Sequence, residues 1–306
     1  TYGVLTREAG FYFYFSRKIR ELRECGHEGT ARAYASSLRS MQRYLGKKDF
    51  PFIKLSSRII SDYQGKLLAS GICDNTIGFY LHNIKALFRK GCREMGLELP
   101  CPFRDISIKT EKTLKRSLDP VVIKTLSAIE LEKDSPLSLA RDIFMFSFYT
   151  RGMSFVDIAL LKKRHVFSGE ICYRRHKTDQ LMRVGINKEI SRILERYKNV
   201  PGEYIFPLFP AERDPYAGYR NAYHRIRYSL GKISRVIGLE FPLRLHAARH
   251  SWATIAKVNG ASVHVIGECL GHTSEKTTRI YLKELDHSAL DAVNNQVADF
   301  ILAVDD

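Results

Sequence analysis

The sequence predicts a mainly helical protein that carries one small antiparallel β-sheet and is divided into two domains. Three observations lead to this prediction. The chain has 306 residues, which is long enough for two domains of ordinary size, each with its own core. Apolar residues recur at spacings of three and four along most of the chain, as in amphipathic helices. The stretch 165–186 alternates instead, and turn residues divide it into short strands.

The first domain is predicted to be a bundle of four helices over residues 1–108. Three apolar stripes at helical spacing and a shorter helix over 57–69 make up the bundle. Each stripe needs a neighbouring helix to cover it, so the four helices are expected to pack together. The stripes are Phe11, Phe15, Ile19 and Leu22, then Ala31, Tyr34, Leu38, Met41 and Leu45, and then Ile77, Leu81, Ile84 and Phe88.

Basic side chains are expected on the other faces of these helices. Residues 1–110 hold 19 Lys and Arg against 10 Asp and Glu, a net charge of +9, within a chain that carries +16 in all. Nucleic acid or an anionic membrane surface is therefore the predicted class of partner. The basic positions on the outer faces are Arg17, Lys18, Arg20, Arg39, Arg43, Lys85, Arg89 and Lys90.

A break in the apolar periodicity at 109–118 predicts a basic linker between the domains. The stretch follows a Pro-Cys-Pro sequence and contains Lys109, Lys112, Lys115 and Arg116, with no apolar repeat. A positively charged linker suits a protein that wraps a nucleic acid duplex.

The second domain, residues 119–306, is predicted to combine helices with the small sheet. Two helical segments open it, and three alternating segments then predict strands with turns at Gly169 and Asp179-Gln180. Helices resume near residue 187 and continue to the end of the chain. The expected helices lie near 119–132, 136–150, 216–237 and 245–258, and the expected strands near 165–167, 171–173 and 182–186.

The composition also excludes several classes of protein. No apolar run is long enough to span a membrane, and the amino terminus lacks the pattern of a signal peptide. The six cysteines form no C-x-x-C motif and have no regular spacing, which argues against a zinc site or a disulfide framework. We therefore expect a soluble intracellular protein with reduced thiols and no bound metal.

The residues most informative about chemistry lie in the last third of the chain. His246 and Arg249 are three apart on a predicted helix, so an imidazole and a guanidinium can converge on one oxyanion. Gly271 suits the end of a helix, which places His272 at a junction. Tyr281 follows about two helical turns later.

In these residues the chain resembles the tyrosine recombinase, or phage integrase, family. An H-x-x-R pair, an L-G-H motif and a tyrosine nine residues after that histidine occur in the family's order and spacing. The hairpin lysine of the family corresponds to Lys177, between the second and third predicted strands. The resemblance covers nearly the whole chain. It implies a helical SAM-like core-binding domain and an α+β catalytic domain that together clamp a DNA duplex.

One element departs from the family pattern. The family's first catalytic arginine stands in a T-G-[LM]-R-x-x-E turn, whereas this chain reads R-G-M-S-F-V-D and has Ser154 in that slot and Asp157 at the acidic position. This variant resembles a branch found on bacterial mobile elements and invertible DNA segments. Arg175 is one candidate replacement, because a spacing of two on a strand would place it on the same face as Lys177. Arg151 is the other candidate.

The resemblance implies that DNA is cut and rejoined without a metal, a cofactor or ATP. Tyr281 would attack the scissile phosphate to give a 3′-phosphotyrosyl enzyme and a free 5′-hydroxyl. Arg249 and His272 would hold the phosphoryl oxygens. His246 would assist at the tyrosine proton, and Lys177 would protonate the leaving oxygen.

The resemblance also implies partners. We expect double-stranded DNA at specific recombination sites, a homotetramer on paired sites and a monomer or weak oligomer when free. Accessory DNA-bending or directionality proteins are further candidates, and a membrane is not. The apolar stripe from Leu290 to Val304 corresponds to the family's exchange helix, expected over 287–304. The expected location is the bacterial cytoplasm, at the nucleoid.

The kind of reaction stays open between integration, excision and inversion. Two rival functions also stay open. One is a DNA-binding protein whose site is inactive because Ser154 has replaced the arginine. The other is a type IB topoisomerase, which shares the phosphotyrosyl chemistry.

Overall fold

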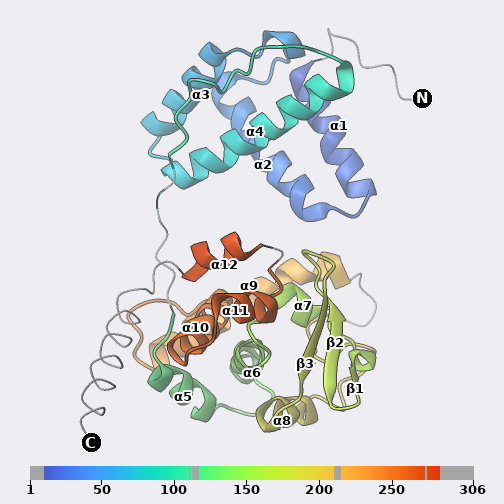
Figure 1. Cartoon of the computed structure of the whole chain (residues 1–306), viewed down its shortest axis with the longest axis vertical. Coiled ribbons are helices and arrows are strands. Elements are labelled where there is room, and N and C mark those ends of the chain that lie inside the picture. The colour runs from blue at the N-terminus through green and yellow to red at the C-terminus, as the bar shows by residue number, and fades with distance from the viewer. Residues whose placement is uncertain (1–9, 110, 112–116, 210–214, 273, 283–306) are drawn as a thin grey trace, which may run out of the picture. The chain divides into compact units, whose positions relative to one another are not determined.

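The computed structural model describes residues 10–109, 111, 117–209, 215–272 and 274–282, apart from the side chains of 215–217, 280 and 281. The chain divides into two compact units, unit 1 (Thr1–Thr113) and unit 2 (Leu114–Asp306). Each unit has its own hydrophobic core, and Figure 1 shows the elements of both. In the described residues, no helix is long and apolar enough to cross a membrane.

Unit 1 is a bundle of four helices, as the sequence predicted. Its core is rich in aromatic rings, and those of Phe52 and Phe88 stack with their centroids 5.4 Å apart. Gly91 makes room for this pair, because a Cβ there would lie 2.4 Å from Phe52 Cζ. The helices are α1 (Phe11–Glu24), α2 (Glu28–Leu45), α3 (Ser57–Ala69) and α4 (Asp74–Met95), with a short 3-10 helix η1 (Phe52–Lys54).

The expectation that every basic residue of the bundle lies on an outer face is wrong for Lys18. Lys18 is 5% exposed, and its Nζ lies 2.7 Å from carboxylate oxygens of both Glu21 and Glu94. Tyr14 donates a 3.0 Å hydrogen bond to the same Glu94 carboxylate. The sequence pattern missed this because Glu94 reaches Lys18 only when α4 packs against α1. The exposed basic residues of the bundle include Arg20, Arg39, Arg43, Arg89 and Lys90.

The described residues at either end of the predicted linker pack on their own unit. In unit 1, the side chain of Asn75 exchanges two 3.0 Å hydrogen bonds with the main chain of Glu111. In unit 2, Leu118 is buried, and its main-chain N–H donates to Ser251 Oγ at 2.7 Å.

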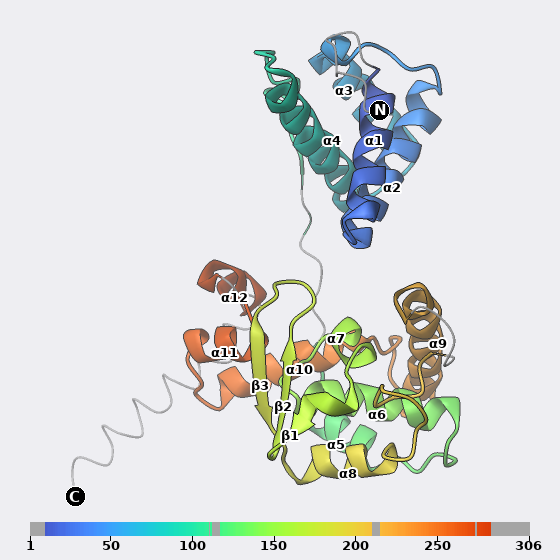
Figure 2. The same cartoon turned by 90° about the vertical axis from the view of Figure 1, so that its right-hand side faces the viewer.

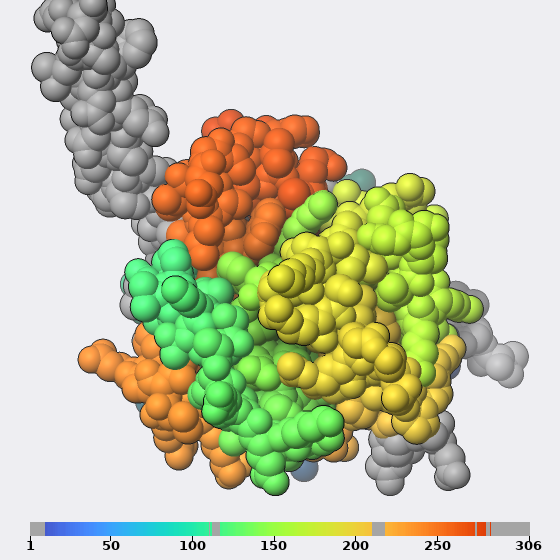
Figure 3. Space-filling view, turned by 90° about the horizontal axis from the view of Figure 1, so that it is seen from below, coloured from blue at the N-terminus to red at the C-terminus, as the bar shows by residue number. Residues whose placement is uncertain are grey.

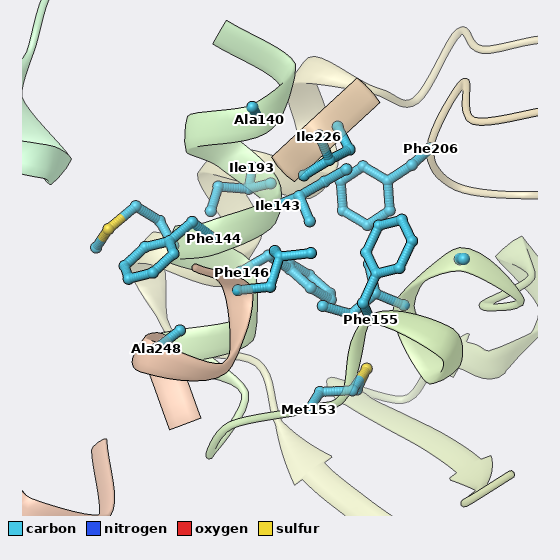
Figure 4. Close-up of a cluster of buried hydrophobic side chains, with 14 of the residues drawn as sticks. Ala140, Ile143, Phe144, Phe146, Met153, Phe155, Ile193, Phe206, Ile226 and Ala248 are labelled. Carbon is cyan, nitrogen blue, oxygen red and sulfur yellow. The ribbon is translucent and has the colours of Figure 1, made fainter. Parts of the chain in front are cut away.

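Unit 2 is built around α6, which lies among the other helices (Figure 1). Residues 143–146 of this helix are at most 2% exposed. Figure 4 shows side chains of α6 meeting Met153, Phe155 of α7, and side chains of α8, α9 and α10. The helices are α5 (Pro120–Ala128), α6 (Pro136–Tyr149), α7 (Phe155–Ala159), α8 (Lys188–Arg196), α9 (Pro215–Val236), α10 (Leu245–Val258), α11 (Val263–Leu270) and α12 (Glu275–Leu282), with a 3-10 helix η2 (Lys163–His165).

The predicted sheet is present and stands at one side of these helices (Figure 2). It contains β1 (Val166–Phe167), β2 (Glu170–Arg174) and β3 (Leu181–Gly185), in the antiparallel order β1-β2-β3. Tyr173 pairs with Met182 and Ile171 with Val184, and all four side chains are buried. The β2–β3 turn lies at one end of the sheet. In the view from below, α5 (green) and yellow residues around α8 lie at the surface, beside orange residues of the later helices (Figure 3).

Candidate active site

Arg249 is the buried centre of the candidate site. It lies on α10, is 5% exposed, and donates hydrogen bonds to the main-chain oxygens of Gly152 (2.8 Å) and Leu270 (2.6 Å). Its Nη2 also lies 3.1 Å from Nε2 of His272. These three partners carry no formal negative charge, so the contacts orient the guanidinium without neutralising it. They also join three chain segments that are far apart in sequence.

Gly152 is the residue that lets Arg249 approach the 151–154 turn. Its φ is +75°, and a Cβ there would lie 2.5 Å from Arg249 Cγ and 2.8 Å from Arg249 Cβ. A side chain would therefore be strained by the backbone conformation and would also collide with the arginine. The sequence pattern of the turn did not by itself indicate this role of Gly152.

His272 follows directly after the end of α11 and contacts two groups of the site. Since a guanidinium can only donate, Nε2 of His272 accepts from Arg249, and Nδ1 carries the proton. That proton is donated to Oγ1 of Thr278, 2.9 Å away. Burial, together with the charges of Arg249, Arg175 and Lys177, lowers the pKa of His272 to about 4. The imidazole is therefore neutral at pH 7, and cations surround it.

Thr278 is a residue that sequence reasoning missed. It is fully buried in α12, three residues before Tyr281, and its hydroxyl fixes the tautomer of His272. Gly267 of α11 makes room for it, because a Cβ at that position would lie 2.9 Å from Thr278 Oγ1. No signal in the sequence distinguished this threonine from others, since its role depends on α12 packing against α11.

His246 lies on α10 with Arg249 but is exposed at the start of the helix. Its ring stands perpendicular to that of His250, with the two centroids 4.5 Å apart. His246, Arg249 and Ser154 line one cavity of about 270 Å³. The predicted pair on one helix face therefore opens onto a common space that is wide enough for an oxyanion.

Lys177 lies in the turn between β2 and β3 and is exposed, so its predicted place at the hairpin tip is confirmed. Its charge adds to the effect of burial in lowering the pKa of the His272 imidazole. Arg175 also contributes to that lowering and donates a hydrogen bond to the main-chain oxygen of Gly271.

The prediction that Arg175 lies on a strand is wrong, although the residue lies at the site. Strand β2 ends at Arg174, so Arg175 stands in the turn, where alternation along a strand does not set its direction. A contact with Gly271 sets it instead. Arg151 has a φ of +60°, and its Nη1 lies 3.4 Å from the main-chain oxygen of Arg183 in β3.

Ser154, in the slot of the family's first arginine, is engaged by a neighbour. Its hydroxyl donates a 2.6 Å hydrogen bond to Asp157 Oδ2. The other oxygen of this buried carboxylate accepts a 2.7 Å hydrogen bond from the main-chain N–H of His176, next to Lys177. The 151–154 turn and α7 are thereby connected to the hairpin.

Tyr281 lies on α12, but its side chain is outside the described part of the structure. The expected exchange helix over 287–304 is also outside it. The other predicted residues come from four segments: the 151–154 turn, the hairpin tip, the start of α10 and the end of α11. Guanidinium, ammonium and imidazole groups placed in this way can bind a phosphate and move a proton at it.

Two family descriptions match most of the chain. Residues 116–287 match the phage integrase family, and residues 10–103 match the phage integrase SAM-like domain. Curated relatives include the tyrosine recombinase XerC of Shewanella oneidensis, which is 26% identical over 226 residues, 71% of this chain and 70% of the relative. They also include XerD of Pseudomonas putida, which is 24% identical over 262 residues, 83% of this chain and 86% of the relative.

Solved structures share the fold at lower identity. A lambda integrase dimer bound to a COC′ core site matches with a TM-score of 0.66 and 16% identity, over 89% of this chain and 95% of that chain. The Tn1549 transposon integrase in complex with transposon right end DNA matches with a TM-score of 0.67 and 14% identity, over 95% and 99%. Because the phage integrase description spans more than half of the residues and includes the candidate site, this chain belongs to the phage integrase family.

Proposed function

We propose that this protein is a site-specific tyrosine recombinase that cuts and rejoins double-stranded DNA through a 3′-phosphotyrosyl intermediate. The observation that carries the proposal is the setting of Arg249. Its buried guanidinium is held by two carbonyl oxygens and His272, and the charges of Arg175 and Lys177 act on the same imidazole. Such a cationic site fits the phosphate of a DNA backbone, and family membership supports the tyrosine chemistry.

In the first step, the phenolic oxygen of Tyr281 attacks the scissile phosphorus, and the bond from phosphorus to the 5′ oxygen breaks. His246 takes the phenolic proton, and Lys177 gives a proton to the leaving oxygen. Arg249 binds the non-bridging oxygens, whose negative charge grows in the transition state. Without DNA, His272 is neutral at pH 7 because its pKa is lowered to about 4, and it accepts a hydrogen bond from Arg249. With the phosphate bound, His272 is proposed to hold the phosphoryl oxygens together with Arg249.

In the second step, the 5′-hydroxyl of a partner strand attacks the phosphotyrosine, and the tyrosine leaves. The proton transfers of the first step run in reverse, so Lys177 accepts the proton of the attacking hydroxyl. The phosphotyrosyl ester conserves the energy of the broken phosphodiester, and the reaction needs no ATP. The cationic side chains provide the charge stabilisation that metal ions provide in other phosphoryl-transfer sites.

The proposal is tested with a nicked duplex that carries the junction sequence recovered around the protein's own gene. The wild-type protein should form a covalent protein–DNA adduct, and Tyr281→Phe should bind the duplex but form none, because only the nucleophilic oxygen is removed. Tyr228→Phe is the matched control, since Tyr228 is an exposed tyrosine of unit 2 on α9, and should form the adduct. An adduct with Tyr281→Phe would overturn the assignment.

Arg175 is proposed to supply the charge that the family's first arginine would supply. Its hydrogen bond to Gly271 and its effect on His272 favour it over Arg151, which is directed toward the main chain of Arg183. Arg175→Ala should slow cleavage by about 10²-fold, the scale of losing one transition-state donor. Ser154→Arg in that background should restore part of the rate, since the new guanidinium supplies charge at the phosphate although the hydroxyl bond to Asp157 is lost. A large loss with Arg151→Ala and none with Arg175→Ala would reverse the choice.

Both the SAM-like domain over residues 1–108 and the catalytic domain over 119–306 are proposed to bind DNA. The affinity should fall steeply with salt, because exposed basic residues neutralise phosphates. A homotetramer on paired sites is the proposed active assembly, and removal of residues 287–306 should abolish synapsis but spare binding to one site. A requirement for two paired sites distinguishes recombination from topoisomerase activity.

The proposed location is the bacterial cytoplasm, at the nucleoid.

A further inference from the structure

The hydroxyl of Ser154 does not perform the usual task of a serine at its position. Ser154 precedes α7 as its N-cap residue, yet its side chain accepts no hydrogen bond from the first turn of that helix. It donates instead to Oδ2 of Asp157, at 2.6 Å. The hydroxyl therefore orients a carboxylate.

Asp157 acts on the hairpin turn that carries Lys177. The carboxylate is 5% exposed, and its Oδ1 accepts a 2.7 Å hydrogen bond from the main-chain N–H of His176. Hydrogen bonds to a buried carboxylate are stronger than those between neutral groups. A change in its orientation would therefore be transmitted to the main chain beside Lys177.

The neighbouring main-chain groups of the turn are bonded within the hairpin. The N–H of Arg175 donates to Gln180 at 2.9 Å, and the N–H of Asp179 donates to the oxygen of Arg175 at 2.8 Å. The N–H of His176 is directed out of the hairpin, to Asp157. This contact ties the tip to α7, and α7 is anchored by Phe155 and Ile158 in the core of unit 2.

We propose that Ser154 is a positioning residue for DNA cleavage, whose hydroxyl fixes Asp157 so that the turn holds the Lys177 ammonium at the leaving oxygen. The inference rests on the proposed function and concerns one proton transfer within it. As the bond from phosphorus to the 5′ oxygen breaks, Lys177 Nζ gives up a proton and the 5′ oxygen receives it. Ser154 touches neither atom and acts through Asp157 and the main chain of His176.

The test compares two nicked duplexes that differ at one atom. One has the natural 5′ oxygen as the leaving atom, and the other has sulfur there. A thiolate leaves without receiving a proton, because thiols are far stronger acids than alcohols. Loss of correct positioning of Lys177 should therefore slow the oxygen substrate and spare the sulfur substrate.

Ser154→Ala should slow cleavage of the oxygen substrate about 10-fold or more and leave the sulfur substrate within about threefold of wild type. Ser154→Thr keeps the hydroxyl, so it should cleave the oxygen substrate at about the wild-type rate. In a Lys177→Ala background, Ser154→Ala should cause no further loss, since the two residues act on one step. The control is Ser234→Ala, which removes a buried hydroxyl that is bonded within α9 and should change neither rate.

A second measurement does not depend on activity. Hydrogen exchange of the His176 amide should rise about tenfold in Ser154→Ala and stay unchanged in Ser234→Ala. Equal slowing of both substrates, or unchanged rates together with unchanged exchange at His176, would overturn the inference. If wild type formed no adduct with either duplex, the proposed function would fall, and this inference with it.

Discussion

Two cationic side chains are buried to the same extent in this protein, one in each unit, and their partners differ. Lys18 and Arg249 are both 5% exposed. Lys18 lies 2.7 Å from each of two carboxylates, those of Glu21 and Glu94. Arg249 donates to two main-chain oxygens and contacts a neutral imidazole.

Burial therefore does not by itself identify a functional cation. A cation matched by carboxylates ties two helices together, because its charge is compensated within the fold. Carbonyl groups orient a cation by their dipoles and do not cancel its charge, so such contacts suit a cation that binds a phosphate. The following variants test this distinction, in order of decreasing expected effect.

Arg249→Lys should slow cleavage by at least about 10²-fold. An ammonium cannot bridge the oxygens of Gly152 and Leu270 and still present a planar pair of donors to a phosphate. Single-turnover adduct formation on the nicked duplex measures the effect, and a filter-binding assay should show that affinity for the duplex changes little. A rate within threefold of wild type would show that only the charge of Arg249 matters.

Gly152→Ala should lower both stability and cleavage, the latter about tenfold, because the new Cβ would displace Arg249. Gly169→Ala is the matched control, since its φ is +77° but no atom lies within 4 Å of the added Cβ. Both variants should lose about 1–2 kcal/mol of stability from backbone strain. If both slow cleavage equally, strain rather than contact with Arg249 is the cause.

Thr278→Val should slow cleavage several-fold, because the Nδ1–H of His272 loses its acceptor and the ring is no longer held in one tautomer. Nitrogen NMR of the imidazole should show a single tautomer in wild type and a mixture in the variant. Thr278→Ser should behave as wild type. Thr277→Val, at an exposed position of the same helix, is the control. An unchanged tautomer in Thr278→Val would contradict the assigned hydrogen bond.

Lys18→Met should leave cleavage within about threefold of wild type and destabilise unit 1 by about 1–3 kcal/mol, because the Glu94 carboxylate loses a close cation. Denaturant unfolding followed by hydrogen exchange in α1 and α4 measures the loss. Adding Glu94→Leu should recover part of it. A large loss of cleavage in Lys18→Met would show that Lys18, like Arg249, is needed for cleavage.

The smallest effect is expected from pH. The pKa of His272 is lowered to about 4 from its usual 6.5, so the unfolded chain binds a proton that the folded unit does not bind. The contribution of His272 to the stability of unit 2 should therefore be fully present above pH 6.5 and be lost as the pH drops toward 4. The loss is modest because the ring is partly exposed.

The contribution of Glu94 to the stability of unit 1 should be lost at a lower pH than that of His272 in unit 2. Burial raises the pKa of this carboxyl, but the hydrogen bonds and charges of Lys18 and the hydrogen bond of Tyr14 lower it below 4.5 overall. Its contribution to unit 1 should be lost only as the pH falls through that lowered value. Hydrogen exchange of each unit in the full chain, measured as the pH is lowered, checks which unit loses stability first. Loss of stability in unit 1 at a higher pH than in unit 2 would contradict the prediction.

Much of the site could be predicted because its motifs are local. His246 and Arg249 share one helix, and Gly271 ends another just before His272, so the spacing of residues was sufficient to place them. The position of Lys177 followed from the alternation of two strands. The direction of Arg175 could not be predicted, because β2 ends one residue earlier and a contact with residue 271 sets it.

The helical bundle, the three-stranded sheet and the order of the catalytic motifs could be predicted from the sequence, because they depend on periodicity, turn residues and spacing along one segment. The neutralisation of Lys18, the need for a residue without a side chain at Gly152, and the orientation of Asp157 by Ser154 toward His176 depend on packing between segments. Arg249 and Gly152 are 97 residues apart, and contacts over such separations form only when particular faces pack together. Periodicity shows that a face is buried, but packing selects its partner.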